Sequence, residues 1–168
     1  MVFNNTILKE LSWNRPEGFH YAISSSQEIL KVFDYVTTHS SIEWAIGSYI
    51  NENNEKSIAL IAGNSSHSVY PISSINEINE ASVLSNIHTH ISPIQDIGAS
   101  GYMPPTKIPN DRYNVTNLEK RMKDMGKPTP KHYVYDVPNG VIYEYNSRKG
   151  DIYSGRYSIK LLKRLLKL

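Results

Sequence analysis

The histidines are the residues of this chain with the clearest potential for chemistry. Cysteine is absent from the 168 residues, whereas six histidines are present. The lack of thiols excludes a disulfide framework, an iron–sulfur cluster, cysteine-ligated zinc and a cysteine nucleophile. A tightly held transition metal would therefore need imidazole and carboxylate ligands, a set that suits zinc, iron, nickel or manganese.

Two of these histidines have the spacing of a shared metal site. His88 and His90 end the apolar segment VLSNIHTHI, which predicts a strand over 83–91. Residues i and i+2 of a strand project to the same face, so both imidazoles can reach one ion. The other interpretation is two histidines bonded to loop carbonyls at a strand end. The long Gly/Pro-rich stretch 92–112 that follows favours a functional site.

A catalytic zinc usually has three protein ligands and one open position, so a carboxylate is needed. Asp96 and Asp111 are the candidates. Asp111 is preferred because it directly precedes a predicted helix, whereas Asp96 lies inside the loop; either residue could instead be a solvated turn residue or a helix N-cap. Glu43 is the candidate general base because it is the only acid in the predicted strand 41–49. Its alternative role is an edge-strand glutamate that faces water.

The elements that position these residues follow from hydrophobic periodicity. The pattern predicts helices over 27–38, 115–125 and 158–168, and strands over 41–49, 56–62, 67–72, 83–91, 132–136 and 141–146. Ser25 and Glu28 have capping-box spacing before the first helix, and Gly126 is a natural stop for the second. This order predicts an α+β, or mixed α/β, fold with helices covering a central sheet.

The length and the charge limit the number of domains and the partners. The chain is expected to be one domain, 1–168, with a core over about 27–157 and a basic amphipathic helix over 158–168. The net charge is +2, but residues 1–119 carry 6 Lys/Arg against 12 Asp/Glu, while 120–168 carry 12 against 4. This basic part could contact nucleic acid or an anionic membrane; the simpler interpretation is a helix whose leucines pack on the sheet and whose lysines face water.

Two further patterns bear on partners and on location. The tyrosines that could serve as stacking platforms alternate along two predicted strands, which favours packing in the sheet; they are Tyr133, Tyr135, Tyr143 and Tyr145. No apolar run approaches the ~20 residues of a membrane span. The first residues lack the basic start and apolar stretch of a signal peptide. We therefore expect neither a transmembrane segment nor a cleavable signal in this chain.

Four segments together resemble a known family. VFDYVTTHSSIEW, SNIHTH, GASGYMPP with DRYN following, and KHYVYDVPNGVIYEYN are similar to the JAB/MPN (JAMM) metalloproteases. More narrowly, they resemble the JAB-like toxin domains of bacterial polymorphic and type VI secretion effectors. The likeness covers about residues 27–146. It implies a JAB/MPN-like, cytidine-deaminase-like fold, in which helices flank a central mixed β-sheet.

The family motif is a glutamate on an early strand, then H-x-H-P, a short spacer and S-x-x-D. Carried over position by position, Glu43 matches the general base, and His88 and His90 match the two imidazole ligands. Ser100 matches the serine that supports the oxyanion. Asp111 is the choice for the carboxylate ligand.

The chain also departs from this motif. Ile91 replaces the proline after the second histidine, and Met103 stands where the motif has its aspartate, so the carboxylate is displaced by an insert. The resemblance implies a Zn²⁺-dependent peptidase or isopeptidase that acts as a toxin delivered into competing or host cells. It implies a protein or peptide substrate and a cognate immunity protein, with no nucleic-acid partner. The alternatives are an inactive JAB-like binding module, or a toxin whose basic tail binds nucleic acid or membrane.

Overall fold

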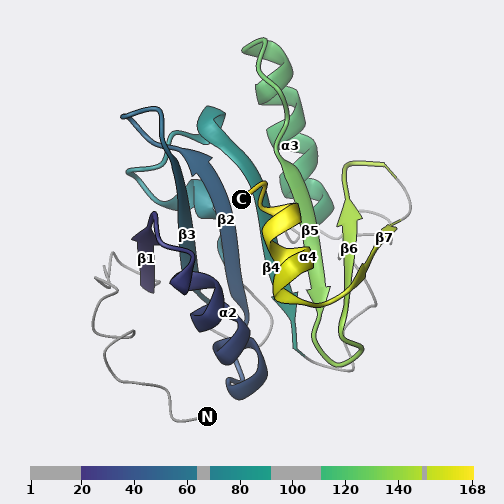
Figure 1. Ribbon diagram of the computed structural model, residues 1–168. Helices are drawn as coiled ribbons and strands as arrows, with labels where there is room; N and C mark the ends of the chain where they lie inside the picture. The colour runs from purple at the N-terminus through teal and green to yellow at the C-terminus, as the bar shows by residue number, and fades with distance from the viewer. Residues whose placement is uncertain (1–19, 64–68, 92–110, 149–150) are drawn as a thin grey trace.

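The computed structural model describes residues 20–63, 69–91, 111–148 and 151–168. These residues form one seven-stranded sheet in the order β1-β3-β2-β4-β5-β6-β7 (Figure 1). The strands are β1 (His20–Ser24), β2 (Trp44–Ile50), β3 (Lys56–Ala62), β4 (Val83–His90), β5 (Lys131–Asp136), β6 (Val141–Tyr145) and β7 (Ile152–Arg156). The helices are α2 (Glu28–His39), α3 (Asp111–Asp124) and α4 (Ile159–Leu165), with two 3-10 turns, η1 (Ile72–Ser74) and η2 (Glu80–Ser82).

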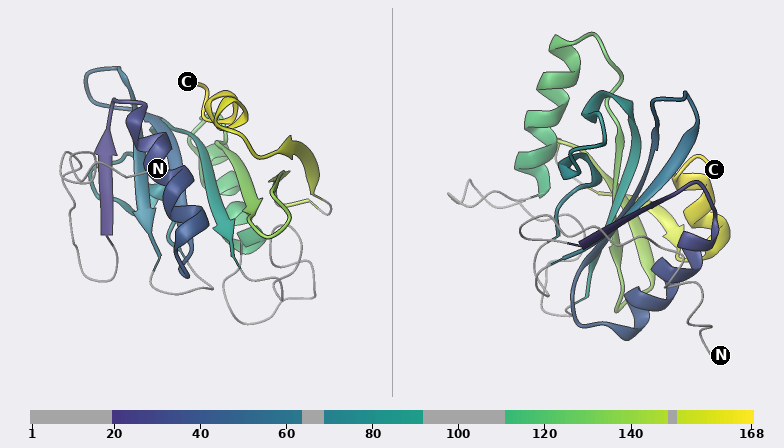
Figure 2. Two further views of the ribbon diagram at one scale, coloured as in Figure 1. Left: turned by 60° about the horizontal axis from the view of Figure 1, so that its bottom comes forward. Right: turned by 90° about the vertical axis from the view of Figure 1, so that its left-hand side faces the viewer.

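The sheet is mixed because one of its strand pairs is parallel. β4 and β5 run parallel, while the other neighbouring pairs in the described sheet are antiparallel. A parallel pair needs a crossover connection, and α3 lies on the connection between these two strands. The two views in Figure 2 place α3 on one face of the sheet, with α2 and α4 on the opposite face.

The face covered by α2 and α4, the helix-pair face, is apolar. Apolar residues recur at helical spacing in α2 and at every second position in the central strands, which gives each element one hydrophobic side. These sides meet in one buried cluster. Its members are Ala22, Ile29, Leu30, Val32, Phe33, Trp44, Ile46, Ile58, Leu60, Ala62, Ile87, Tyr133, Tyr135, Ile142, Leu161, Leu162, Leu165 and Leu166.

The face covered by α3 and η1, the α3 face, has two smaller apolar clusters. One lies over β1 to β3, with Tyr21, Ala45, Tyr49, Ala59, Ile61, Ile72, Ile75, Ile78 and Val83. The other lies under α3, with Val115, Val134 and Tyr145. Buried polar side chains stand on β4 and β5 between these clusters, among them Asn86, His88, His90 and His132.

A basic C-terminal helix forms as predicted, but it spans Ile159–Leu165 instead of 158–168. Ser158 caps α4 by accepting a hydrogen bond from the backbone N–H of Leu161, 3.1 Å away. Leu162 and Leu166 are fully buried in the cluster shared with α2, whereas Lys160 is exposed. No helix in the described part of the chain has the length and apolarity that a membrane span requires.

Two predictions of local structure are wrong. Ser25 does not cap α2; its N-cap is Gln27, without a side-chain cap. The strand predicted over 67–72 does not form in the described residues 69–72. Pro71 has no N–H to donate, and the backbone N–H of Ile72 bonds the side chain of Asn86, at 3.2 Å, in place of a neighbouring strand.

The helix predicted over 115–125 begins earlier, at Asp111, and ends at Asp124. Met125 therefore follows the helix and is exposed instead of buried. Gly126 takes the left-handed conformation expected of a helix stop, with φ of 64°.

Candidate metal centre

Three side chains converge on the α3 face at the end of β4. The Nε2 atoms of His88 and His90 lie 3.2 Å apart. The Oδ2 atom of Asp111 lies 3.3 Å from the first of these nitrogens and 3.5 Å from the second. Both imidazoles are buried, and the carboxylate is partly buried. Among the described residues, these three form the group of potential metal ligands whose atoms gather within 4.8 Å.

The sheet and the crossover explain this convergence. His88 and His90 are two residues apart on β4 and therefore share a face, with Thr89 on the other face. The hydroxyl of Thr89 accepts a hydrogen bond from the backbone N–H of Trp44, at 2.8 Å, and the carbonyl of His90 accepts one from Val137, at 3.0 Å. The strand end is thus held on both sides. Asp111, the first residue of α3, reaches the site from the helix that covers this face.

Arg112, the residue after Asp111, holds the start of α3 in place through its side-chain contacts. Arg112 is buried and donates to the carbonyls of Asn146, at 2.9 Å, and Arg148, at 2.7 Å, and it forms an ion pair with Asp151. These contacts fix the first turn of α3 against the end of β6 and the start of β7. The position of the Asp111 carboxylate follows from that docking.

Tyr145 lies against the ring nitrogen of His88 that points away from the cluster. Its hydroxyl lies 3.4 Å from Nδ1 of His88, and the two rings meet edge to face with centroids 5.7 Å apart. When the hydroxyl accepts from the Nδ1 proton, Nε2 keeps its lone pair, which is the form that binds a metal. Burial raises the pKa of Tyr145 well above its usual value, so the phenol stays neutral.

The carboxylate and the imidazoles of the cluster shift one another's pKa values. Burial lowers the pKa of the His88 imidazole. The charge of Asp111, a hydrogen bond to it and the charge of Glu43 outweigh burial, so the pKa of His88 is raised overall. Burial raises the pKa of the Asp111 carboxyl, yet His88 and His90 hold it well below its usual range. The carboxylate is therefore ionised at neutral pH, as a metal ligand must be.

Glu43 lies close to this cluster. It comes one residue before β2, and its charge contributes to raising the pKa of His88, so its carboxylate is near that imidazole. Its side chain is 3% exposed, and its carbonyl accepts a hydrogen bond from Gly63, at 2.7 Å.

The donor set fits a zinc ion. Zinc with metal–ligand distances of about 2.1 Å in a tetrahedral site separates its ligand atoms by about 3.4 Å. The three separations here, 3.2, 3.3 and 3.5 Å, match that spacing. Two imidazoles and one carboxylate are also a donor set found in zinc hydrolases, where the fourth position stays open.

The structure brings three of the predicted site residues together, His88, His90 and Asp111, and it places Glu43 near enough for its charge to affect the pKa of His88. Ser100 and the alternative carboxylate Asp96 lie outside the described residues. Sequence reasoning did not assign Tyr145, Asn86 or His132 to the site. Alternation in the predicted strand 83–91 places Asn86 on the same face as His88. His132 and Tyr145 become neighbours of these residues through the pairing of β5 with β4 and β6, which is not local in sequence.

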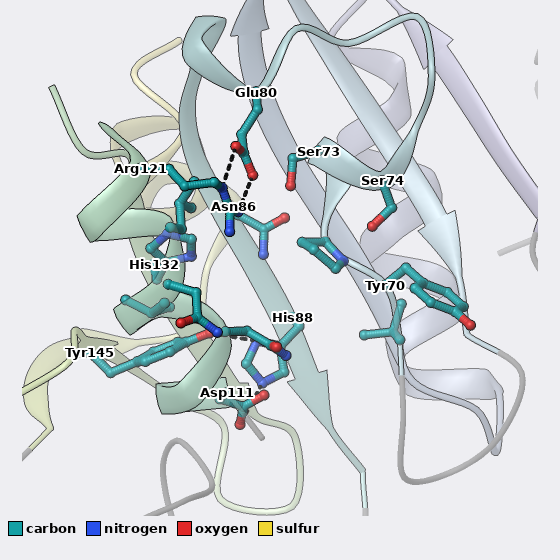
Figure 3. Close-up of a pocket in the computed structure, with 16 residues that line it drawn as sticks. Tyr70, Ser73, Ser74, Glu80, Asn86, His88, Asp111, Arg121, His132 and Tyr145 are labelled. Atoms are coloured by element: carbon teal, nitrogen blue, oxygen red, sulfur yellow. Dashed lines mark hydrogen bonds and ion pairs between the residues drawn. The ribbon is translucent and has the colours of Figure 1, made fainter. Parts of the chain in front are cut away.

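The side chains of His88, His90 and Asp111 are called the metal cluster below, after the ion they could bind. A pocket of about 440 Å³ opens beside it. Figure 3 shows His88 and Asp111 at one end and the ion pair of Glu80 and Arg121 at the other. The walls come from β4 and β5, from α3, and from residues 69–74. A group bound in this pocket would lie next to the candidate ligands.

A mixed sheet with one parallel pair, helices on both faces and a His-His-Asp cluster at the end of a central strand is consistent with a JAB-like fold. Comparison with known families agrees: the model of JAB-like toxin 1 matches residues 21–125, more than half of the chain. The chain therefore belongs to the JAB-like toxin 1 family, and it is a toxin domain of that type. Comparison with curated proteins and with solved structures gives no match.

Proposed function

We propose that this toxin domain is a zinc-dependent peptidase or isopeptidase. The observation that carries the proposal is the mutual spacing of 3.2 to 3.5 Å among the ligand atoms of His88, His90 and Asp111. Membership of the JAB-like toxin family supports a hydrolytic toxin. The bond cleaved would be a peptide or isopeptide bond in a protein or peptide substrate.

In this proposal the side chains have distinct roles. Zinc, when held by the two imidazoles and the carboxylate, supplies Lewis-acid activation of water. Glu43, which is buried and lies near His88, would accept the proton of the attacking water and pass it to the leaving amine. Tyr145 orients His88, and Arg112 holds the helix that carries Asp111. Ser100 would donate its hydroxyl to the oxyanion, as the family resemblance implies, an effect worth ~3 to 4 kcal/mol.

The biological setting is part of the proposal. A toxin domain of this family would be delivered into a competing or host cell and would act there on a protein. A producing cell would need protection, so we include a cognate immunity protein as a partner.

Zinc content and a base variant test the proposal together. The purified chain should bind about one zinc, and Glu43→Gln should retain that zinc and the fold, because Glu43 is not among the three ligands. Peptide cleavage and growth inhibition should fall by roughly 10²-fold to 10⁴-fold, the usual contribution of a general base. Metal analysis, mass spectrometry of digested peptides and growth curves after induction give the three readouts.

Glu52→Gln is the matched control, because Glu52 is exposed on the turn between β2 and β3. It should behave as the wild type in all three assays. A wild-type chain that binds no zinc would contradict the proposed metallopeptidase activity. Undiminished growth inhibition by Glu43→Gln would favour a toxin that acts by binding.

A further inference from the structure

The pocket beside the metal cluster is built from residues to which the proposed chemistry assigns no role. Between its two ends lie Asn86 on β4 and His132 on β5, with Asn117 from α3 and Ser73 from η1. Asn86 and His132 are direct partners in the parallel register and project to the same face. The pocket therefore runs along the sheet away from His88 over a row of uncharged polar side chains (Figure 3).

The charged groups in the described lining of the pocket are already matched. Arg121 donates to both carboxylate oxygens of Glu80, at 3.0 Å from Nε and 2.6 Å from Nη2. The carboxylate of Asp111 faces the two imidazoles of the metal cluster. A charged ligand group would thus lose water without gaining a dedicated counter-charge, which is unfavourable in a partly enclosed site.

The uncharged polar groups retain hydrogen-bonding capacity. The Oδ1 atom of Asn86 accepts from the backbone N–H of Ile72, at 3.2 Å, so the side chain is fixed and its amide nitrogen remains as a donor. His132 is 6% exposed, and its Nε2 atom is buried without a hydrogen-bond partner in the described structure. Buried polar atoms of this kind usually have a partner, so an unpaired one beside a pocket points to a ligand or water.

We propose that this pocket receives an uncharged, hydrogen-bonding side chain of the substrate, of the carboxamide type found in glutamine and asparagine. A carboxamide donates and accepts, which matches an asparagine amide and a neutral imidazole in one pocket. The inference rests on the proposed function, since it places this side chain next to a scissile carbonyl at the metal cluster. It adds selectivity for one class of residue at that position.

Binding of matched peptides to the full chain tests the pocket without requiring turnover. The probes are acetyl-Ala-Ala-Gln-Ala-Ala-amide and the same peptide with Glu or Lys at the centre. Nuclear magnetic resonance titration, with and without zinc, follows the ring of His132 and the side-chain amide of Asn86. The Gln peptide should shift these signals saturably and bind at least about tenfold more tightly than the Glu and Lys peptides, a difference of about 1.4 kcal/mol.

Asn86→Asp is the sharpest variant, because it keeps the acceptor for Ile72 and replaces the amide donor with a carboxylate oxygen. Its preference for the Gln peptide over the other two peptides should be about tenfold smaller than that of the wild type. It should also bind the Lys peptide more tightly than the wild type does. Asn53→Asp makes the same change at an exposed position of the turn between β2 and β3 and should leave all three affinities unchanged. His132→Gln, with a carboxamide in place of the ring, offers a second variant should Asn86→Asp fail to fold, and it too should weaken binding of the Gln peptide.

Two results separate this inference from the proposed function. Selective binding of the Gln peptide by a chain that neither holds zinc nor cleaves peptides would support the proposed role of the pocket and contradict the proposed hydrolase activity. Zinc-dependent cleavage with equal affinity for the three peptides, or with no shift at Asn86 and His132, would overturn the pocket and retain the hydrolase.

Discussion

The two faces of the sheet differ in what they bury. The helix-pair face holds one continuous apolar cluster between the sheet, α2 and α4. The α3 face divides its apolar residues into two clusters and buries a glutamate, an asparagine and three histidines, two of which lie beside an aspartate. Apolar burial stabilises at about 25 cal/mol per Å², whereas buried polar groups need partners to avoid a cost. The comparison teaches that the main apolar cluster and the candidate metal centre lie on opposite faces of the same strands.

β4 shows this division in consecutive residues. Ile87 is fully buried against α2 and α4, and His88, the next residue, faces Asp111 and Tyr145. Substitutions at these two positions should therefore separate metal affinity from folding stability. The predictions below use that contrast.

The largest effect is expected from removing a ligand on the α3 face. His88→Ala should lower zinc affinity by more than about 100-fold, beyond the range typical for residues that only orient a ligand. The free energy of unfolding without zinc should change less than it does for a truncation on the helix-pair face. Competition titration against a chromophoric chelator and urea unfolding measure the two quantities. Zinc affinity equal to that of the wild type would remove His88 from the site.

The neighbouring substitution on the helix-pair face should give the opposite result. Ile87→Ala should lower the free energy of unfolding by about 2 to 5 kcal/mol, because it opens a cavity in a fully packed cluster. Zinc affinity of the folded fraction should stay within a few-fold of the wild type. Urea unfolding followed by zinc titration under native conditions tests this. A large loss of zinc affinity here would show that the two faces are not independent.

The next effect is a pH dependence that arises on the α3 face. Burial, together with the nearby charge on His88, lowers the pKa of His132 from 6.5 to about 4. The unfolded chain therefore binds a proton more readily than the folded chain between those values, and stability present above pH 6.5 is lost as the pH falls. Between pH 7 and pH 5, His132 should therefore lower the free energy of unfolding by about 2 kcal/mol, at 1.36 kcal/mol per pKa unit.

His132→Asn should remove that part of the pH slope in urea unfolding measured at pH 7, 6 and 5. His39→Asn, which removes an exposed imidazole at the end of α2, is the control and should keep the wild-type slope. An unchanged slope in His132→Asn would mean that His132 titrates normally in the folded protein.

The smallest expected effect concerns the orientation of a ligand. Tyr145→Phe removes the hydroxyl beside Nδ1 of His88 and should lower zinc affinity by roughly 10-fold to 100-fold. Tyr143→Phe is the control, since Tyr143 lies two residues away on β6 and contacts Tyr153. Isothermal titration with zinc compares the two variants. Equal affinities would show that Tyr145 only packs against the ring.

Most of the elements could be predicted from sequence because their periodicity is strong. The apolar run of β3 and the helical spacing of Ile29, Leu30 and Phe33 each identify one element without reference to the rest of the chain. β7 could not be predicted. Its residues Ile152 and Tyr153 are both exposed, and Gly155 interrupts the segment, so no alternation is present.

The candidate site was predictable in part for the same reason. His88 and His90 share a strand, so their common face follows from local geometry. Asp111 could be preferred over Asp96 from its place before a predicted helix, but its approach to the histidines depends on how α3 docks and is not visible in the sequence. Tyr145 and His132 gave no recognisable signal, because their relation to β4 arises from strand pairing across the sheet.

The parallel pairing of β4 with β5 has a consequence for when the site exists. The two candidate imidazole ligands end the strand before the crossover, and the candidate carboxylate ligand begins the helix within it. Closing such a connection costs chain entropy before any long-range contact forms, so parallel pairs are slow steps in folding. In an unfolded chain the three candidate ligands are therefore present but not held together. If the site binds a metal, unfolding would abolish that binding, and docking of the crossover would restore it.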